Sequence, residues 1–207
     1  AGWRATPVAR RTFGGEGRAL ASMADELGVH VLVVGTRGLA GPGAVLDSVT
    51  DQVVHESPRP VLVVPHPMLT DERECAASGP VVAGWDGSAG ARAAVCAAAA
   101  LFASRELIAV TVGPGVEEAV EVADGRRITT VTVPEPLPVP GPGRGTAGAL
   151  IGAARGRGAG VLVVGSRGRS ALREIVLGST AMATLHRAHL PVLVVPPRVD
   201  KVVADTR

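Results

Sequence analysis

The chain has 207 residues, enough for one large domain or two small ones, and its apolar fraction of 46% comes from Ala, Val and Leu rather than from aromatic residues. The net charge is +2, and the basic residues are scattered without interleaved aromatic side chains, which argues against a nucleic-acid-binding groove. No apolar stretch approaches the roughly 20 residues that span a bilayer, and no basic-then-apolar signal pattern opens the chain, so we expect a soluble cytoplasmic protein that binds no membrane.

Two segments of the chain occur twice. Residues 31–38, Val-Leu-Val-Val-Gly-Thr-Arg-Gly, recur at 161–168 as Val-Leu-Val-Val-Gly-Ser-Arg-Gly. Residues 60–65, Pro-Val-Leu-Val-Val-Pro, recur unchanged at 191–196. The repetition indicates two related lobes, each ending as helix, strand, glycine loop, helix and strand. Val-rich runs of this length are typical of strands buried on both faces of a parallel sheet.

The first lobe, residues 1–69, contains only the second half of this plan. A helix is predicted over residues 16–26, with Gly28 as its C-terminal cap. The repeated strands follow at 31–34 and 61–64. Nothing before residue 31 resembles the strand and helix that open the second lobe, so we interpret the first lobe as an incomplete domain, either shortened or clipped.

The second lobe, residues 80–198, follows a linker at 70–79 and precedes a tail at 199–207. This linker is part of a polar segment, residues 66–79, that contains a proline near its start. The predicted elements, in chain order, are a strand at 81–85, a helix at 89–104 capped by Ser88, strands at 107–112 and 128–133, a helix at 146–155 capped by Thr146, a strand at 161–165, a helix at 179–189 and a strand opening at Pro191. This alternation predicts a parallel sheet in an α/β domain, in tandem with the partial first copy.

A glycine loop follows the strand at 161–165. Gly165 and Gly168 are separated by two residues, and Gly178-Ser179 comes after nine more. Glycines let the chain turn sharply and bring backbone N–H groups close to a ligand, while the amides and dipole at a helix start favour a phosphate. Ser179 and Thr180 add hydroxyl donors, so the loop predicts a polyphosphate nest without a lysine. The alternative is that the glycines only turn the chain.

Asp86 follows the first strand of the second lobe. In an open doubly wound sheet, ligands bind beyond the carboxyl ends of the strands at the point where the strand order reverses. If the strand at 81–85 lies beside that at 161–165, Asp86 and Gly165 meet at this edge, where a carboxylate can accept hydrogen bonds from a base or a ribose. Its alternative role is to cap the next helix together with Ser88.

The spacing Gly-x2-Gly-x9-Gly-Ser between a Val-rich strand and a Pro-Val-Leu-Val-Val strand, with Gly-Trp-Asp-Gly-Ser upstream, resembles the ATP-binding class of the universal stress protein family. The resemblance implies a Rossmann-like open parallel sheet in the order 3-2-1-4-5, with helices on both faces, and a bound ATP with or without Mg2+. It places Asp86 at the adenine or ribose and the Val112 backbone at the base, and lets Arg167 and Arg169 add positive charge. The residues it implies at the ribose and phosphates are Val164, Gly165, Gly168, Gly178, Ser179 and Thr180.

The second lobe departs from that family at its third strand. Only residues 113–127 are available for the helix that usually precedes this strand, and residues 134–145, rich in Pro and Gly, look like an irregular insertion. We therefore expect the wall over the adenine to be open or mobile, which would weaken binding.

The first lobe departs further from the pattern of that family. Asp47 stands where the repeat places Gly178, and a carboxylate there would repel a phosphate. No counterpart of Asp86 is present, so we expect no nucleotide in this lobe. A structural role follows instead: its strand at 61–64 would pair with the strand at 192–195, joining the two lobes or two chains edge to edge.

A phosphate nest is not a catalyst. The second lobe has no Gly-x4-Gly-Lys motif and no evident pair of carboxylates for Mg2+, and His186 and His189 share a helix face without a third ligand. We expect a nucleotide-dependent regulatory protein of stress response, in which ATP occupancy biases conformation or assembly. The alternatives are a slow ATP hydrolase or self-phosphorylating enzyme, and an interaction module whose nucleotide site has decayed.

Overall fold

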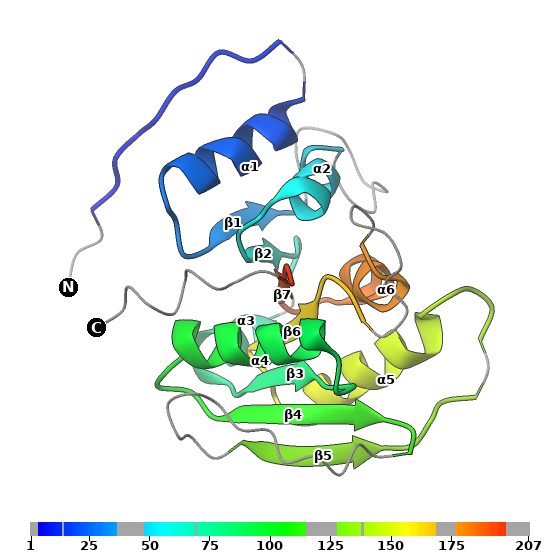
Figure 1. Ribbon diagram of the computed structural model, residues 1–207. Coiled ribbons are helices and arrows are strands. Elements are labelled where there is room, and N and C mark those ends of the chain that lie inside the picture. Colours follow the sequence, from blue (N-terminus) through cyan, green and yellow to red (C-terminus); the bar gives the residue numbers. More distant parts are fainter. Residues whose placement is uncertain are drawn as a thin grey trace.

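A seven-stranded sheet runs through both lobes in the computed structural model, which describes residues 4–13, 15–36, 48–68, 70–114, 128–137, 139–168 and 177–197 (Figure 1). The strands are β1 (Leu32–Gly35), β2 (Val61–Val64), β3 (Val81–Gly84), β4 (Leu107–Val112), β5 (Thr129–Val133), β6 (Val161–Gly165) and β7 (Val192–Val195). The helices are α1 (Glu16–Glu26), α2 (Ser48–Glu56), α3 (Thr70–Ser78), α4 (Ala89–Leu101), α5 (Arg144–Arg155) and α6 (Ser179–Arg187).

The strand order of the whole sheet is β1-β2-β7-β6-β3-β4-β5. Within the second lobe this is the predicted order 3-2-1-4-5, and each neighbouring pair in that lobe is parallel. Val161–Val164 of β6 and all of β7 are buried. Strands that are apolar on both faces are stable only where helices cover both sides of the sheet, so the valine runs account for the α/β fold.

Two apolar clusters lie on opposite faces of the sheet. Leu162 and Val163, neighbours on β6, belong to different clusters, as the alternation of side chains along a strand requires. On one face the Ala-rich helix α4 packs against β3, β6 and β7, and its small side chains let it lie close to the strands. On the other face α2, α5 and α6 contribute to the cluster that contains Leu162. The predicted helices on both faces are therefore present.

Three predicted helix ends are shifted in the structure. Helix α5 begins at Arg144, so the residue in the N-cap position is Gly143 and not Thr146. Gly143 has a left-handed backbone conformation, with φ of 69°. Helices α4 and α6 end at Leu101 and Arg187, where the next residue leaves helical backbone geometry. The irregular insertion predicted at 134–145 has no helix or strand over its described residues 134–137 and 139–143, but its last two residues, Arg144 and Gly145, belong to α5. No helix in the described part of the chain is long and apolar enough to cross a membrane.

The segment predicted as a linker is largely helical. Residues Thr70–Ser78 form α3, which buries none of its side chains. Acidic residues in its first turn and alanines in its last favour a helix by local propensity. Arg105 holds the end of α3 against the second lobe, donating hydrogen bonds of 2.9 and 2.8 Å to the carbonyls of Ala76 and Ala77.

The two lobes are joined by the antiparallel pairing of β2 with β7, as the sequence predicts. Leu62 lies opposite Leu193, and Val61 lies opposite Val194. Leu62 and Leu193 occupy the same position of the repeated Pro-Val-Leu-Val-Val-Pro segment, so equivalent residues face each other and the junction has local two-fold symmetry. Each strand thus removes the free edge of the other.

The first lobe is a half-domain at one end of this sheet. Strand β1 pairs in parallel with β2 and forms the outer edge, while α1 packs on α2. Arg18 of α1 donates two hydrogen bonds, 2.7 and 3.0 Å long, to the carboxylate of Glu56 on α2. Val33 of β1 is 57% exposed, because the described part of this lobe has no helix equivalent to α4.

The junction residue Leu193 provides a stability test. Its side chain is fully buried, so Leu193→Ala should lower the free energy of unfolding by about 2–5 kcal/mol through lost contacts and a residual cavity. Leu137→Ala, at a leucine that is 86% exposed, should change it by less than about 0.5 kcal/mol. Urea denaturation monitored by circular dichroism measures both. Equal effects of the two substitutions would contradict the burial of the β2–β7 junction.

Candidate functional site

A cavity of about 350 Å³ lies at the carboxyl ends of β3, β4 and β6. Strand β3 has β4 on one side and β6 on the other, so this is the point at which the strand order reverses. Nine of the ten residues predicted for a nucleotide site line this cavity, and the tenth, Arg169, lies outside the described residues. The nine are Asp86, Val112, Val164, Gly165, Arg167, Gly168, Gly178, Ser179 and Thr180.

Backbone hydrogen bonds hold the glycine loop to the sheet and to α6. The Ser166 N–H donates to the Val195 carbonyl of β7 at 2.7 Å, and the Gly178 N–H donates to the Ser166 carbonyl at 2.7 Å. The Gly178 amide therefore closes the loop. Helix α6 begins directly after it, and no side chain in the described part of the chain caps this end. The first amides of α6 remain available to a ligand, as at the start of any helix.

Close backbone packing explains why residue 165 is a glycine. A Cβ on Gly165 would lie 2.6 Å from the carbonyl oxygen of Gly90, in the first turn of α4. A Cβ on Gly90 would in turn collide with the carbonyl oxygen of Arg167. The start of α4 thus rests directly on the glycine loop. Sequence analysis missed Gly90, although a glycine in the first turn of an otherwise Ala-rich helix was a visible signal.

Asp86 reaches from β3 to the glycine loop, as the sheet geometry predicts. Its Oδ1 accepts a hydrogen bond of 3.0 Å from the Ser88 N–H, and Ser88 Oγ accepts one of 3.1 Å from the Ala91 N–H. Its Oδ2 lies 3.1 Å from the position that a Cβ on Gly168 would occupy. One oxygen therefore helps to organise the start of α4, while the other faces the loop. A role in capping α4 and a role in contacting a ligand are thus compatible for Asp86.

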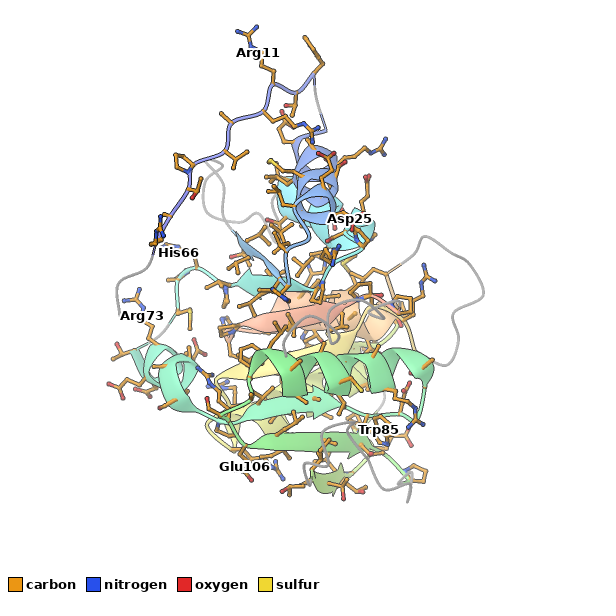
Figure 2. The ribbon with its side chains drawn as sticks, turned by 60° about the vertical axis from the view of Figure 1, so that its left-hand side comes forward. Arg11, Asp25, His66, Arg73, Trp85 and Glu106 are labelled. Carbon is orange, nitrogen blue, oxygen red and sulfur yellow. The ribbon has the colours of Figure 1, made fainter. Side chains whose placement is uncertain are left out.

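Trp85 is a further residue of the cavity that sequence analysis did not single out. Its side chain is 3% exposed, and its indole Nε1 has no hydrogen-bond partner in the described part of the chain. It lies at the end of β3, with the guanidinium of Arg92 on α4 5.3 Å from its ring centroid (Figure 2). A buried N–H without an acceptor is costly, so a polar ligand atom or a water in the cavity is its expected partner.

The corresponding region of the first lobe is built differently. Thr50 of α2 donates a 2.8 Å hydrogen bond to the Gly35 carbonyl, which ties the helix directly to the end of β1. Asp47, expected to block a phosphate here, lies outside the described residues. The described first lobe also lacks counterparts of β3 and α4, which carry Asp86 and Gly90 in the second lobe. The cavity walls that a nucleotide needs are therefore present in the second lobe alone among the described residues.

The described lining of the cavity carries one charged side chain of each sign. Asp86 is the only carboxylate and Arg167 the only arginine among the described lining residues. No group of three His, Cys, Asp or Glu side chains that could hold a metal ion is found in the described ranges. His186 and His189 are both exposed.

Comparison with known proteins extends this description. The model of the universal stress protein family matches residues 5–65 and 143–196, which lie in the two lobes and together cover more than half of the chain. No curated protein matches the chain.

Solved structures show the same fold. A universal stress protein from Archaeoglobus fulgidus DSM 4304 is similar with a TM-score of 0.60 and 20% identity, over 88% of this chain and 67% of that one. A functionally unknown protein from Pseudomonas aeruginosa PAO1 gives a TM-score of 0.57 and 16% identity, over 93% of this chain and 71% of that one. At such identities the likeness supports the arrangement of strands and helices.

The contact between α4 and the glycine loop predicts opposite effects for two helical glycines. Gly90→Ala should destabilise the protein by about 1–3 kcal/mol, because the new methyl group displaces the Arg167 carbonyl. Gly152→Ala, in α5 with open space around the added methyl, should stabilise it by about 0.5–1 kcal/mol through helix propensity. Thermal unfolding followed by circular dichroism distinguishes the two. A stabilising Gly90→Ala would contradict the close packing of α4 on the loop.

Proposed function

The chain belongs to the universal stress protein family, and we propose that it is a nucleotide-dependent regulatory protein that binds one ATP in its second lobe. The observation that carries the proposal is the cavity at the switch point of the sheet, where Asp86, the glycine loop and the start of α6 come together. Its volume of about 350 Å³ falls within the range of small-molecule sites.

The phosphate groups would lie at the start of α6. Backbone amides and the dipole of this helix attract anions, and the hydroxyl groups of Ser179 and Thr180 can add donors. Arg167 supplies positive charge at the same wall. These groups provide a polyphosphate site without a lysine.

The adenosine would lie over the ends of β3 and β4. Val110 and Val112 supply apolar contact for a base, and Pro114 lies at the edge of the cavity. Asp86 Oδ2 is placed to accept a hydrogen bond from the ribose or the base. Residues 115–127, expected to leave the adenine wall open, fall outside the described residues, so that expectation stays a prediction.

The described site favours binding over turnover. Its lining contains one carboxylate, whereas phosphoryl transfer generally relies on several groups that hold Mg2+ and position the nucleophile. A bound nucleotide would instead bias the protein between conformations or assemblies. The Ser166–Val195 hydrogen bond connects the glycine loop to β7, and β7 pairs with β2 at the junction of the two lobes.

Calorimetric titration of ATP with Mg2+ tests the proposal. The intact chain should bind one equivalent. Gly178→Asp should weaken binding by about 100-fold, equivalent to about 2.7 kcal/mol, because it places a carboxylate at the start of α6. Gly152→Asp adds the same charge on α5 in open space and should bind ATP as the intact chain does.

Fluorescence gives a second readout of the same experiment. Trp85 lines the cavity, so in a Trp3→Phe background its emission should change on ATP addition. Failure of the folded intact chain to bind any adenine nucleotide would contradict the proposal and favour an interaction module. Sustained Mg2+-dependent release of phosphate would favour the hydrolase alternative.

A further inference from the structure

A second cavity lies where the two lobes meet. Its volume is about 410 Å³, and it is enclosed by the connection between α2 and β2 of the first lobe and by the ends of β6 and β7 of the second. Of the residues that the family resemblance implies at the nucleotide, Arg167 alone among the described ones also lines this cavity. Because β2 and β7 are antiparallel, the start of β2 lies beside the end of β7, and this brings the two walls together.

The floor of this junction cavity is apolar. It is formed by Val54, Val61, Leu177 and Val194, each 7% exposed or less and all members of one core cluster. Prolines 58, 196 and 197 add apolar surface at its sides. A ligand seated here would therefore place a hydrocarbon part against the floor.

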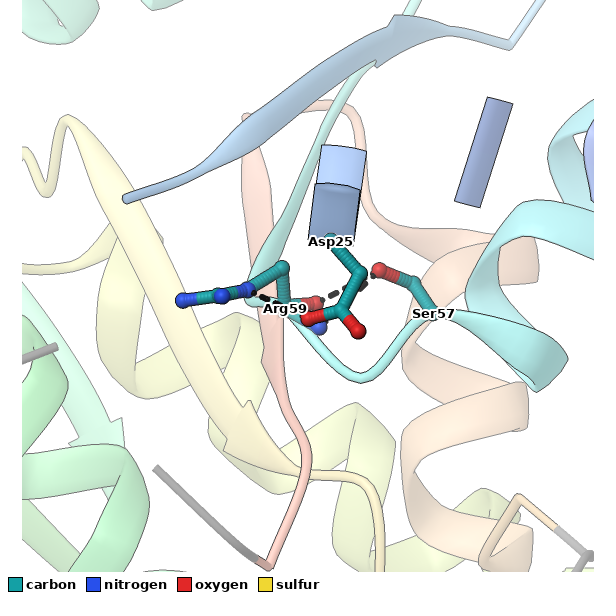
Figure 3. Close-up of polar contacts among 3 residues, drawn as sticks. All are labelled: Asp25, Ser57 and Arg59. Carbon is teal, nitrogen blue, oxygen red and sulfur yellow. Dashed lines mark hydrogen bonds and ion pairs between the residues drawn. The ribbon is translucent and has the colours of Figure 1, made fainter. Parts of the chain in front are cut away.

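Arg59 supplies a cation beside that floor. Its side chain is only 17% exposed, and its Nε donates a 3.0 Å hydrogen bond to Oδ1 of Asp25. Ser57 is bonded to the backbone of Arg59 and not to its side chain, and the guanidinium extends away from Ser57 (Figure 3). The terminal nitrogens of Arg59 have no acceptor in the described part of the chain. An arginine side chain that is mostly buried and has unused terminal donors is suited to a carboxylate.

Glu56 is the one acidic side chain among the described lining residues, and it is already paired. Arg18 donates two hydrogen bonds to its carboxylate and thereby lowers the pKa of Glu56 below its usual value. His55 is turned to its own helix, with Nδ1 2.8 Å from the Asp51 carbonyl oxygen. Arg167 adds a second cation to the lining. With Glu56 held by Arg18, the terminal donors of Arg59 are the groups in this cavity that suit an anion.

We propose that the junction cavity binds a small amphipathic carboxylate, with its aliphatic chain on the valine floor and its carboxylate on Arg59. The site is separate from the nucleotide cavity, although Arg167 lines both. It requires both lobes, since Arg59 and Val61 come from one and Leu177 and Val194 from the other.

Octanoate is a suitable probe of this site. In a methyl-labelled sample of the full chain, octanoate titration should shift the methyl resonances of Val54, Val61, Leu177 and Val194 saturably. Octanamide, which keeps the chain and lacks the charge, should bind at least about tenfold more weakly, as expected when a hydrogen bond to a charged group is lost. This comparison uses the unmodified protein and does not depend on a variant folding.

Three variants assign the charge to Arg59. Arg59→Gln should weaken octanoate binding about tenfold or more. Arg155→Gln removes an exposed arginine that lines neither cavity and should leave binding unchanged. Asp25→Asn removes the carboxylate that competes for Arg59 and should leave binding equal or tighter.

The absence of a saturable shift up to about 10 mM octanoate would overturn the proposal, because a Kd above that concentration corresponds to a binding free energy weaker than about 3 kcal/mol. Equal binding of octanamide, equal binding by folded Arg59→Gln, or shifts confined to the nucleotide cavity would also overturn it.

Discussion

The hydrogen-bonded pairing of β2 with β7 is the interaction on which the arrangement of this chain depends. Without it the first lobe would be two short strands and two helices, too little to bury an independent core, and β7 would be a free apolar edge. The pairing places two symmetry-related leucines opposite each other and makes one continuous sheet. It also brings Arg59, which precedes β2, to the end of β7. The junction cavity adjoins β7, and Arg167, in the loop after β6, lines both cavities.

The two lobes share a repeat but differ in what surrounds it. In the second lobe β3 and α4 lie beside β6, so Asp86 and the Gly90 backbone close around the glycine loop. In the described first lobe no strand covers the outer edge of β1, and Thr50 ties α2 to Gly35. In the second lobe the site is therefore formed by more than a strand and its glycine loop. The neighbouring strand and its helix supply the other wall.

Much of this architecture could be predicted from the sequence because it depends on local patterns. The valine runs predict buried parallel strands, and the identical Pro-Val-Leu-Val-Val-Pro segments predict which strands meet. Asp86 and the glycine loop could be placed together because strand order alone brings their ends to one edge. By contrast, the role of Gly90 depends on how closely a helix approaches a loop, and the orphan indole N–H of Trp85 depends on side-chain burial. The junction cavity depends on the register of an antiparallel pair, which places residues distant in sequence on facing walls.

The most direct test of the central claim, one nucleotide site at the switch point of the second lobe, is amide chemical-shift mapping with ATP and with tripolyphosphate. We predict that both ligands shift the amides of Gly168, Ser179 and Thr180, and that ATP alone also shifts those of Asp86 and Val112. Amides of the first lobe, such as Gly35, should not change. Shifts distributed equally over the two lobes, or an identical response to both ligands, would contradict the account.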